Sequence, residues 1–148
     1  MLNLFVVTGI SGSGKTSVLN MLEDLGYYCI DNLPVALIKN ALSMLSANGY
    51  RRIALSVDAR DKESSKSLIP TIDSLQNQYD INGIFLTAST MVLQRRYSET
   101  RRRHPFSFHN DTTDEKELPY TIIECIEKER VLMAKIQEKF LMKIKTIL

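Results

Sequence analysis

Residues 9–16 read Gly-Ile-Ser-Gly-Ser-Gly-Lys-Thr, and this stretch decides the fold predicted for the 148-residue chain. Its spacing matches G-x-x-x-x-G-K-[ST], in which glycines let the backbone turn tightly and bring N–H groups close to phosphate oxygens. Lys15 can reach the β- and γ-phosphates of a nucleotide, and the Thr16 hydroxyl can ligate Mg²⁺. The stretch therefore predicts a phosphate-binding loop formed by Gly9, Ile10, Ser11, Gly12, Ser13, Gly14, Lys15 and Thr16.

The sequence on either side has the pattern that such a loop requires. An apolar run at residues 4–7 precedes it, and Val18, Leu19, Leu22 and Leu25 follow at helical spacing. The loop is thus expected between a buried strand and the N-terminus of a helix, whose partial positive charge favours anions. A glycine-rich turn with an incidental lysine would not need both flanks in register.

Farther along the chain, strand and helix patterns alternate. The periodicities predict strands at residues 4–8, 27–30, 53–57 and 84–86 and helices at 15–25, 34–48, 68–79, 91–103 and 122–144, with Pro70 near the start of its helix and a polar loop at 104–117. Strands separated by helices imply a parallel sheet covered on both faces. The sequence predicts an α/β domain over residues 1–148, three layers thick and of the P-loop NTPase/kinase type.

The basic, amphipathic tail at residues 139–145 lies where a fifth strand would be expected. We interpret it as the end of a long last helix, so that the sheet would lack its last strand. A sheet edge exposed in this way favours association, and a homo-oligomer is one expected consequence.

Composition limits the classes of function. The formal net charge of +2 is too small to predict nucleic-acid binding, and no apolar stretch is long enough to span a membrane. Cys29 and Cys125 lack metal-ligand spacing, and His104 and His109 have no acidic or cysteine cluster in register. We expect a cytoplasmic protein with reduced core thiols.

Two aspartates are candidates for holding Mg²⁺ beside Thr16. Asp58 follows a buried strand, as the acidic partner of a phosphate-binding loop does, and Asp31 ends the second expected strand. Both strand ends would face the ligand crevice of a doubly wound sheet. The alternative for each aspartate is a turn residue that caps the next helix.

A basic cluster at residues 95–104 allows three interpretations. Arg95 and Glu99 have the i, i+4 spacing of a solvated, salt-bridged helix face. Arg95, Arg101 and Arg102 can instead contact nucleotide phosphates, because guanidinium binds phosphate oxygens in pairs. The third interpretation is a patch for the RNA backbone, for which we expect only weak, salt-dependent binding.

Several longer stretches resemble the RapZ/YvcJ family of bacterial P-loop nucleotide-binding proteins. The resemblance covers about residues 1–135 and rests on the loop at 9–16 together with Glu-Asp-Leu-Gly-Tyr-Tyr-Cys at 23–29, Ile-Asp-Asn-Leu-Pro at 30–34, Val-Asp-Ala-Arg at 57–60 and Ser-Glu-Thr-Arg-Arg-Arg-His-Pro at 98–105. The chain departs from the family at Asp61, where members usually have Asn. The family also continues into a C-terminal domain, associated with RNA and a signal metabolite, that is absent from residues 1–148.

The resemblance implies ATP or GTP as cofactor, with Mg²⁺. It implies ATP binding at residues 9–16, guanine-nucleotide contact at Asp58, Ala59, Arg60 and Asp61, and weak hydrolysis involving Lys15, Thr16 and Asp58. In better-studied members it also implies an adapter that delivers a small regulatory RNA to a ribonuclease.

Two other functions stay open on the sequence alone. A small-molecule kinase would use the same loop and would need a carboxylate, for which Asp31 is well placed, to orient a substrate hydroxyl. A truncated remnant that binds little is the other alternative, because the tail after Lys135 does not match the family.

Overall fold

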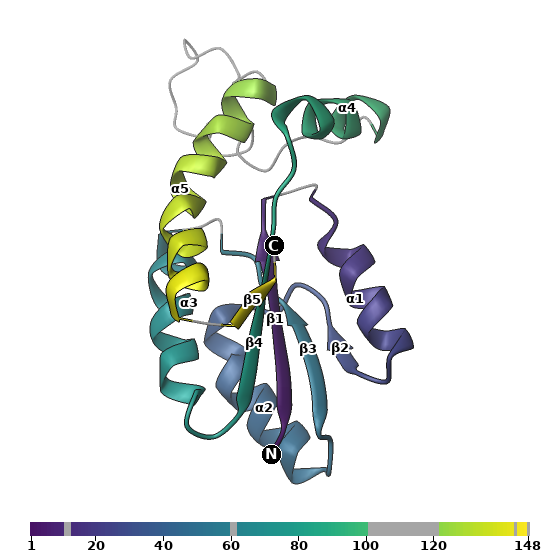
Figure 1. The fold of residues 1–148 in the computed structure, drawn as a ribbon, viewed down its shortest axis with the longest axis vertical. Helices are drawn as coiled ribbons and strands as arrows, with labels where there is room; N and C mark the ends of the chain where they lie inside the picture. The colour runs from purple at the N-terminus through teal and green to yellow at the C-terminus, as the bar shows by residue number, and fades with distance from the viewer. Residues whose placement is uncertain (11–12, 60–61, 101–121, 144, 148) are drawn as a thin grey trace, which may run out of the picture.

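The computed structural model describes residues 1–10, 13–59, 62–100, 122–143 and 145–147. Along the chain the elements are β1 (Asn3–Gly9), α1 (Lys15–Asp24), β2 (Tyr28–Ile30), η1 (Val35–Leu37), α2 (Ile38–Ala47), β3 (Arg52–Ser56), α3 (Lys62–Leu75), β4 (Asp80–Leu86), α4 (Thr90–Thr100), α5 (Ile122–Lys143) and β5 (Lys145–Ile147). Figure 1 shows the strands side by side at the centre, between helices.

The described strands form a five-stranded sheet in the order β2-β3-β1-β4-β5, and every pair is parallel. β1 is central: Val6 pairs with Leu55 of β3 on one side and with Gly83 of β4 on the other. Because all strands run the same way, their carboxyl ends meet at one edge of the sheet. The predicted parallel α/β fold of the P-loop type is confirmed.

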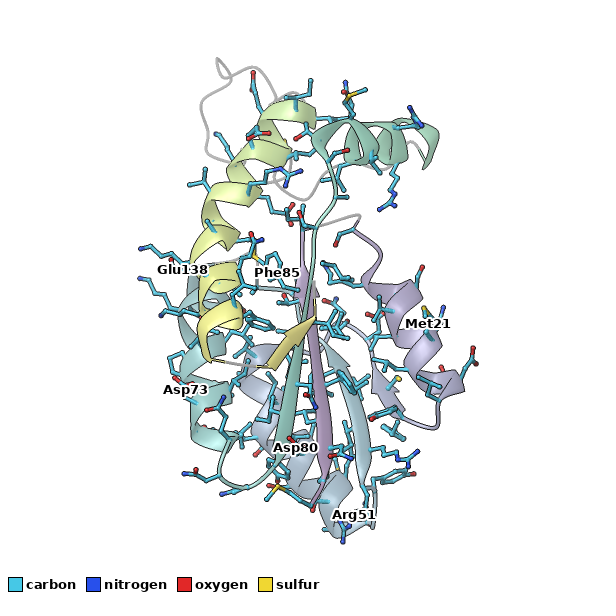
Figure 2. All side chains as sticks on the ribbon, in the orientation of Figure 1. Met21, Arg51, Asp73, Asp80, Phe85 and Glu138 are labelled. Atoms are coloured by element: carbon cyan, nitrogen blue, oxygen red, sulfur yellow. The ribbon has the colours of Figure 1, made fainter. Side chains whose placement is uncertain are left out.

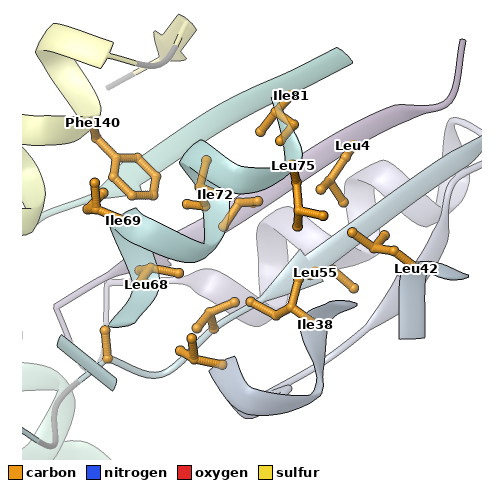
Figure 3. Close-up of a cluster of buried hydrophobic side chains, with 14 of the residues drawn as sticks. Leu4, Ile38, Leu42, Leu55, Leu68, Ile69, Ile72, Leu75, Ile81 and Phe140 are labelled. Atoms are coloured by element: carbon orange, nitrogen blue, oxygen red, sulfur yellow. The ribbon is translucent and has the colours of Figure 1, made fainter. Parts of the chain in front are cut away.

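Helices cover both faces, as the strand–helix alternation predicts. α1 lies on one face, whereas α2, α3 and α5 lie on the other (Figure 1). Alternate residues of β1 point to opposite faces of the sheet, and each face has its own hydrophobic cluster. Leu4 and Val6 belong to the larger cluster, and Val7 packs with Leu19 and Leu22 of α1 in the smaller one. Figure 3 shows the larger core, where side chains from α2, α3 and α5 meet the sheet.

Apolar side chains make up most of the buried core. Phe85 of β4 is fully buried and contacts Phe140 of α5 edge to face, with ring centroids 6.1 Å apart. Met21, Asp73 and Glu138 lie on the outer sides of their helices (Figure 2). The packing that positions the carboxyl edge of the sheet is therefore mostly apolar.

The expected absence of the last strand is wrong. α5 ends at Lys143, and β5 pairs in parallel with Asn82, Gly83 and Ile84 of β4. The apolar residues up to Phe140 keep helical spacing, but the tail then contains β-branched residues at Thr146 and Ile147, which favour a strand. The tail thus changes period within a few residues.

Other boundaries also differ from the prediction. α3 begins at Lys62, and Pro70 lies inside it rather than near its start. β4 begins at Asp80, four residues before the predicted start at residue 84. Its first half contains Asp80, Asn82 and Gly83, which are poor strand formers and therefore gave no strand pattern in the sequence. α4 is described only as far as Thr100, and the predicted loop at 104–117 lies outside the described residues.

Candidate functional site

The phosphate-binding loop begins where β1 comes very close to β4. Gly9 has a φ of +147°, and a Cβ added there would lie 2.2 Å from the carbonyl oxygen of Leu86. The same oxygen accepts a hydrogen bond of 3.1 Å from the Ile10 N–H. Only glycine fits this approach, so the first position of the motif is fixed by contact with the neighbouring strand.

The loop ends on the N-terminus of α1. Gly14 is the N-cap residue, has a left-handed φ of 103°, and makes no side-chain cap. Apart from its own chain neighbours, no described residue has a heavy atom within 4 Å of where its Cβ would be. The first N–H groups of any helix lack partners within the helix, and here no side chain of the cap residue covers them. This end of α1 is therefore suited to an anion.

Lys15 lies across the start of the loop. Its Nζ donates a hydrogen bond of 3.1 Å to the carbonyl oxygen of Gly9, and the side chain is partly buried. The ammonium group is therefore held near the loop backbone, whose N–H groups bind phosphate in this motif. A point charge at this place can neutralise phosphate oxygens without any rearrangement of the core.

Thr16 is brought to Asp31, at the end of the second strand. The Thr16 hydroxyl donates to Asp31 Oδ2 at 3.2 Å. A hydroxyl has one proton and two lone pairs, so this donation leaves the Thr16 oxygen able to ligate a cation. Hydroxyl and carboxylate oxygens are the donors that Mg²⁺ prefers, and the pair therefore fits that ion.

The remaining ligands of such a cation would come from elsewhere. Among the residues that the structure describes, no three histidine, cysteine or acidic side chains gather as a metal site. Mg²⁺ commonly keeps several waters and binds through one or two protein groups plus substrate phosphates. Thr16 and Asp31 match that usage.

Asp58, the other acidic candidate, lies one strand from the loop. It follows β3 by two residues and is half-buried, and Ala59 beside it is buried. Val57 ties this segment to β1, because its N–H donates to the Val7 carbonyl and its carbonyl accepts from the Thr8 hydroxyl, each at 2.9 Å. Asp58 is thus at the same carboxyl edge as the loop.

Other predicted site residues are placed only in part. Arg95 of α4 has an exposed side chain. Ser13 is partly buried, and both its N–H and its hydroxyl donate to the Ile10 carbonyl, which closes the turn. The predictions that fall outside the described residues are those for Ser11, Gly12, Arg60, Asp61, Arg101 and Arg102.

Two features of the site were not predicted from the sequence. The first is the burial of Ile10, whose side chain is 2% exposed and packs against Leu93 of α4 and Ile126 of α5. The motif leaves its second position unspecified, so the available signal was weak: an apolar residue in an otherwise polar loop. The loop is consequently fixed to both helices.

The second is an ion pair on α5 that holds the segment after β4. Arg130 donates to the Ala88 carbonyl and, at 3.3 Å, to the Thr87 hydroxyl. Glu127 accepts from the Thr90 hydroxyl at 3.1 Å and lies 4.0 Å from Arg130 Nε. The i, i+3 spacing of the two residues was the available signal. Arg130 and Glu127 thus hold in place the segment that follows Leu86.

Both cysteines are free thiols. Burial raises the pKa of the Cys29 thiol, and nearby Glu23 adds to the shift. Burial also raises the pKa of Cys125, which lies fully buried on α5. Thiols of this kind are mostly protonated at neutral pH, in keeping with a structural role.

The sequence of the chain is similar to those of known proteins. The model of the RapZ-like N-terminal domain matches residues 2–146. A nucleotide-binding protein of Ralstonia nicotianae is 43% identical over 140 residues, covering 90% of this chain and 47% of the relative. One from Cupriavidus taiwanensis is 43% identical over 147 residues, covering 93% and 48%. The chain therefore spans about half the length of the curated relatives it matches.

Solved structures resemble it in fold. A chain in the structure of the Pnkp1/Rnl/Hen1 RNA repair complex has a TM-score of 0.61 at 14% identity, covering 94% of this chain and 46% of that one. Among the described residues, none of the helices is both long enough and apolar enough to cross a membrane.

Proposed function

Because the chain belongs to the family of RapZ-like N-terminal domains, we propose that it binds a nucleoside triphosphate, ATP or GTP, together with Mg²⁺. One observation carries the proposal. The Lys15 ammonium group donates a hydrogen bond to the Gly9 carbonyl, and the Thr16 hydroxyl donates one to Asp31, so a cationic group and a hydroxyl–carboxylate pair flank one loop. Calorimetric titration with ATP and GTP, with and without Mg²⁺, tests it. An absence of binding to both nucleotides would refute it.

In this proposal each group has a separate role. The N-terminus of α1 and Lys15 bind the phosphates, and Thr16 with Asp31 or Asp58 hold the cation, which neutralises phosphate charge when bound. The same donors would stabilise charge that develops on phosphate oxygens, and slow hydrolysis follows from that preference. Phosphate release from wild-type protein, compared with a Lys15→Ala variant, measures this activity.

Changing either aspartate to asparagine is expected to weaken Mg²⁺-dependent binding. For Asp58→Asn and Asp31→Asn we predict a loss of about tenfold in nucleotide affinity when Mg²⁺ is present, because asparagine keeps the shape but removes the charge that attracts the ion. Without Mg²⁺ the affinity should change little or rise, since a negative charge near the phosphates is gone. Titrations at several Mg²⁺ concentrations measure both.

Asp73→Asn is a suitable control, because Asp73 is an exposed acid on the outer side of α3 (Figure 2). It should leave both affinities at the wild-type value. An aspartate whose change has the same effect with and without Mg²⁺ has no part in the metal site.

The contacts of Asp31 favour metal binding over a kinase reaction. A small-molecule kinase would use this carboxylate to orient a substrate hydroxyl. Here Oδ2 accepts from Thr16, whose hydroxyl is proposed to ligate Mg²⁺, and Oδ1 accepts from Ser56, so hydrogen bonds within the chain hold the carboxylate beside that hydroxyl. The proposed binding of Mg²⁺ by Thr16 and Asp31 accounts for these contacts directly.

RNA binding by this chain alone is expected to be weak, non-specific and strongly dependent on salt. The net charge is only +2, and the described arginines of the basic cluster, Arg95 and Arg96, are exposed on one helix. Phosphate contacts of this kind lose affinity steeply with salt and carry no sequence preference. Filter binding at two salt concentrations, with a structured small RNA and a scrambled control, measures it. Tight binding that distinguishes the two RNAs at physiological salt would contradict the expectation.

A further inference from the structure

Ser56 is a buried hydroxyl beside the candidate metal site. It is the last residue of β3 and is 2% exposed. Its Oγ donates a hydrogen bond of 2.5 Å to Asp31 Oδ1. The carboxylate of Asp31 is thus held from two sides, by Ser56 on the sheet and by Thr16 on α1.

The protons at Ser56 can be assigned from its partners. The Ser56 Oγ also accepts a hydrogen bond of 2.6 Å from the Asn32 N–H. A backbone N–H can only donate, so the single hydroxyl proton of Ser56 is left for Asp31. The direction of the Ser56–Asp31 bond is therefore fixed by the backbone rather than chosen freely.

The turn after β2 is shaped around the same residue. Asn32 has a left-handed φ of 57°, and Leu33 N–H donates to the Ser56 carbonyl at 2.9 Å. Two successive N–H groups thereby point at one serine. Asparagine is one of the few residues that tolerate this backbone conformation, and the turn places Asp31 at a definite point over the end of β3.

We propose that Ser56 is a positioning residue for the metal-associated carboxylate. By holding Oδ1, it turns Oδ2 toward Thr16, so that the hydroxyl and the carboxylate present a preformed pair to Mg²⁺. The inference rests on the proposed function and deepens it. It predicts that Ser56, which is too buried to reach a nucleotide readily, nevertheless controls how strongly Mg²⁺ improves nucleotide binding.

The first test compares Ser56→Ala with wild-type protein. Loss of a group that orients a metal ligand typically lowers metal affinity by about 10-fold or more. We therefore expect the Mg²⁺ concentration for half-maximal enhancement of ATP or GTP binding to rise about tenfold, with Mg²⁺-free affinity unchanged. A merely structural serine would alter both affinities together or neither.

Ser74→Ala is the control for loss of a serine hydroxyl. The Ser74 hydroxyl donates to the Thr71 carbonyl at 2.7 Å within α3, and not to Asp31. The variant should keep both the wild-type Mg²⁺ dependence and the wild-type Mg²⁺-free affinity. If Ser74→Ala raises the Mg²⁺ requirement as much as Ser56→Ala does, the inference is overturned.

A double-mutant cycle tests whether Ser56 acts through Asp31. In an Asp31→Asn background, Ser56→Ala should cause no further change in the Mg²⁺ requirement, because the group that it positions has already lost its charge. Effects that simply multiply would show that Ser56 acts by another route and would overturn the inference.

A measurement without metal or nucleotide completes the design. Amide exchange at Asn32 should become about fivefold faster in Ser56→Ala, because that N–H loses its acceptor. An unchanged rate would overturn the inference. Wild-type protein that binds no nucleotide would refute the proposed function and this inference together, whereas normal Mg²⁺-dependent binding by Ser56→Ala would overturn the inference alone.

Discussion

Replacing Lys15 by alanine is expected to weaken ATP or GTP binding by about 100-fold while leaving the domain folded. A charge-assisted hydrogen bond contributes about 2–3 kcal/mol, which corresponds to a change of this size. Lys15 is in the loop rather than in the apolar core, and its Nζ contacts the Gly9 carbonyl. Calorimetric titration measures the affinity, and thermal unfolding followed by circular dichroism checks the fold.

Arg51→Ala provides the control for loss of a positive charge. Arg51 is exposed at the opposite end of the sheet from the loop (Figure 2). The Arg51→Ala variant should bind nucleotide with the wild-type affinity at the same ionic strength. An unchanged affinity in Lys15→Ala would show that the loop does not use its lysine for phosphate, against the proposal.

Replacing Gly9 by alanine is expected to destabilise the protein by about 3 kcal/mol or more and to abolish nucleotide binding. The added Cβ would lie 2.2 Å from the Leu86 carbonyl oxygen and 2.8 Å from the Leu86 nitrogen. Both are backbone atoms of a paired strand, so neither can move aside without separating β1 from β4. Urea denaturation measures the free energy of unfolding.

Gly49→Ala is the control that distinguishes the destabilisation caused by the contact with β4 from that caused by backbone strain alone. Gly49 also has a positive φ, +89°, but apart from its own chain neighbours no described residue has a heavy atom within 4 Å of where its Cβ would be. Its cost should be about 1 kcal/mol, the price of a left-handed conformation for alanine. Equal costs at the two positions would mean that the β4 contact contributes nothing.

Most of the fold could be predicted from the sequence, because the strongest signals in the sequence are local. Glycine spacing in residues 9–16, the apolar run before it and the helical spacing after it predict β1, the loop and α1 together. Asp31 was predicted as a metal-site candidate from its position after a short strand, and the structure places it on Thr16. Its role at a metal site stays a prediction.

The features that were missed depend on contacts between distant segments. β5 is recognisable only once β4 offers an edge for Asn82, Gly83 and Ile84 to pair with. Ser56 looks like one more strand residue, because its hydrogen bond reaches 25 positions back along the chain. No window of neighbouring residues contains both partners of such a pair.

Ile10 gives the loop a mechanical connection to the rest of the molecule. Because this side chain is buried against Leu93 and Ile126, the loop cannot shift without moving α4 or α5, or opening the contact between them. These two helices flank residues 101–121 in the chain, where the arginine-rich run lies. We therefore expect any ligand that moves the loop to shift those helices as well, and by reciprocity we expect anything that holds the helices to alter the affinity of the loop.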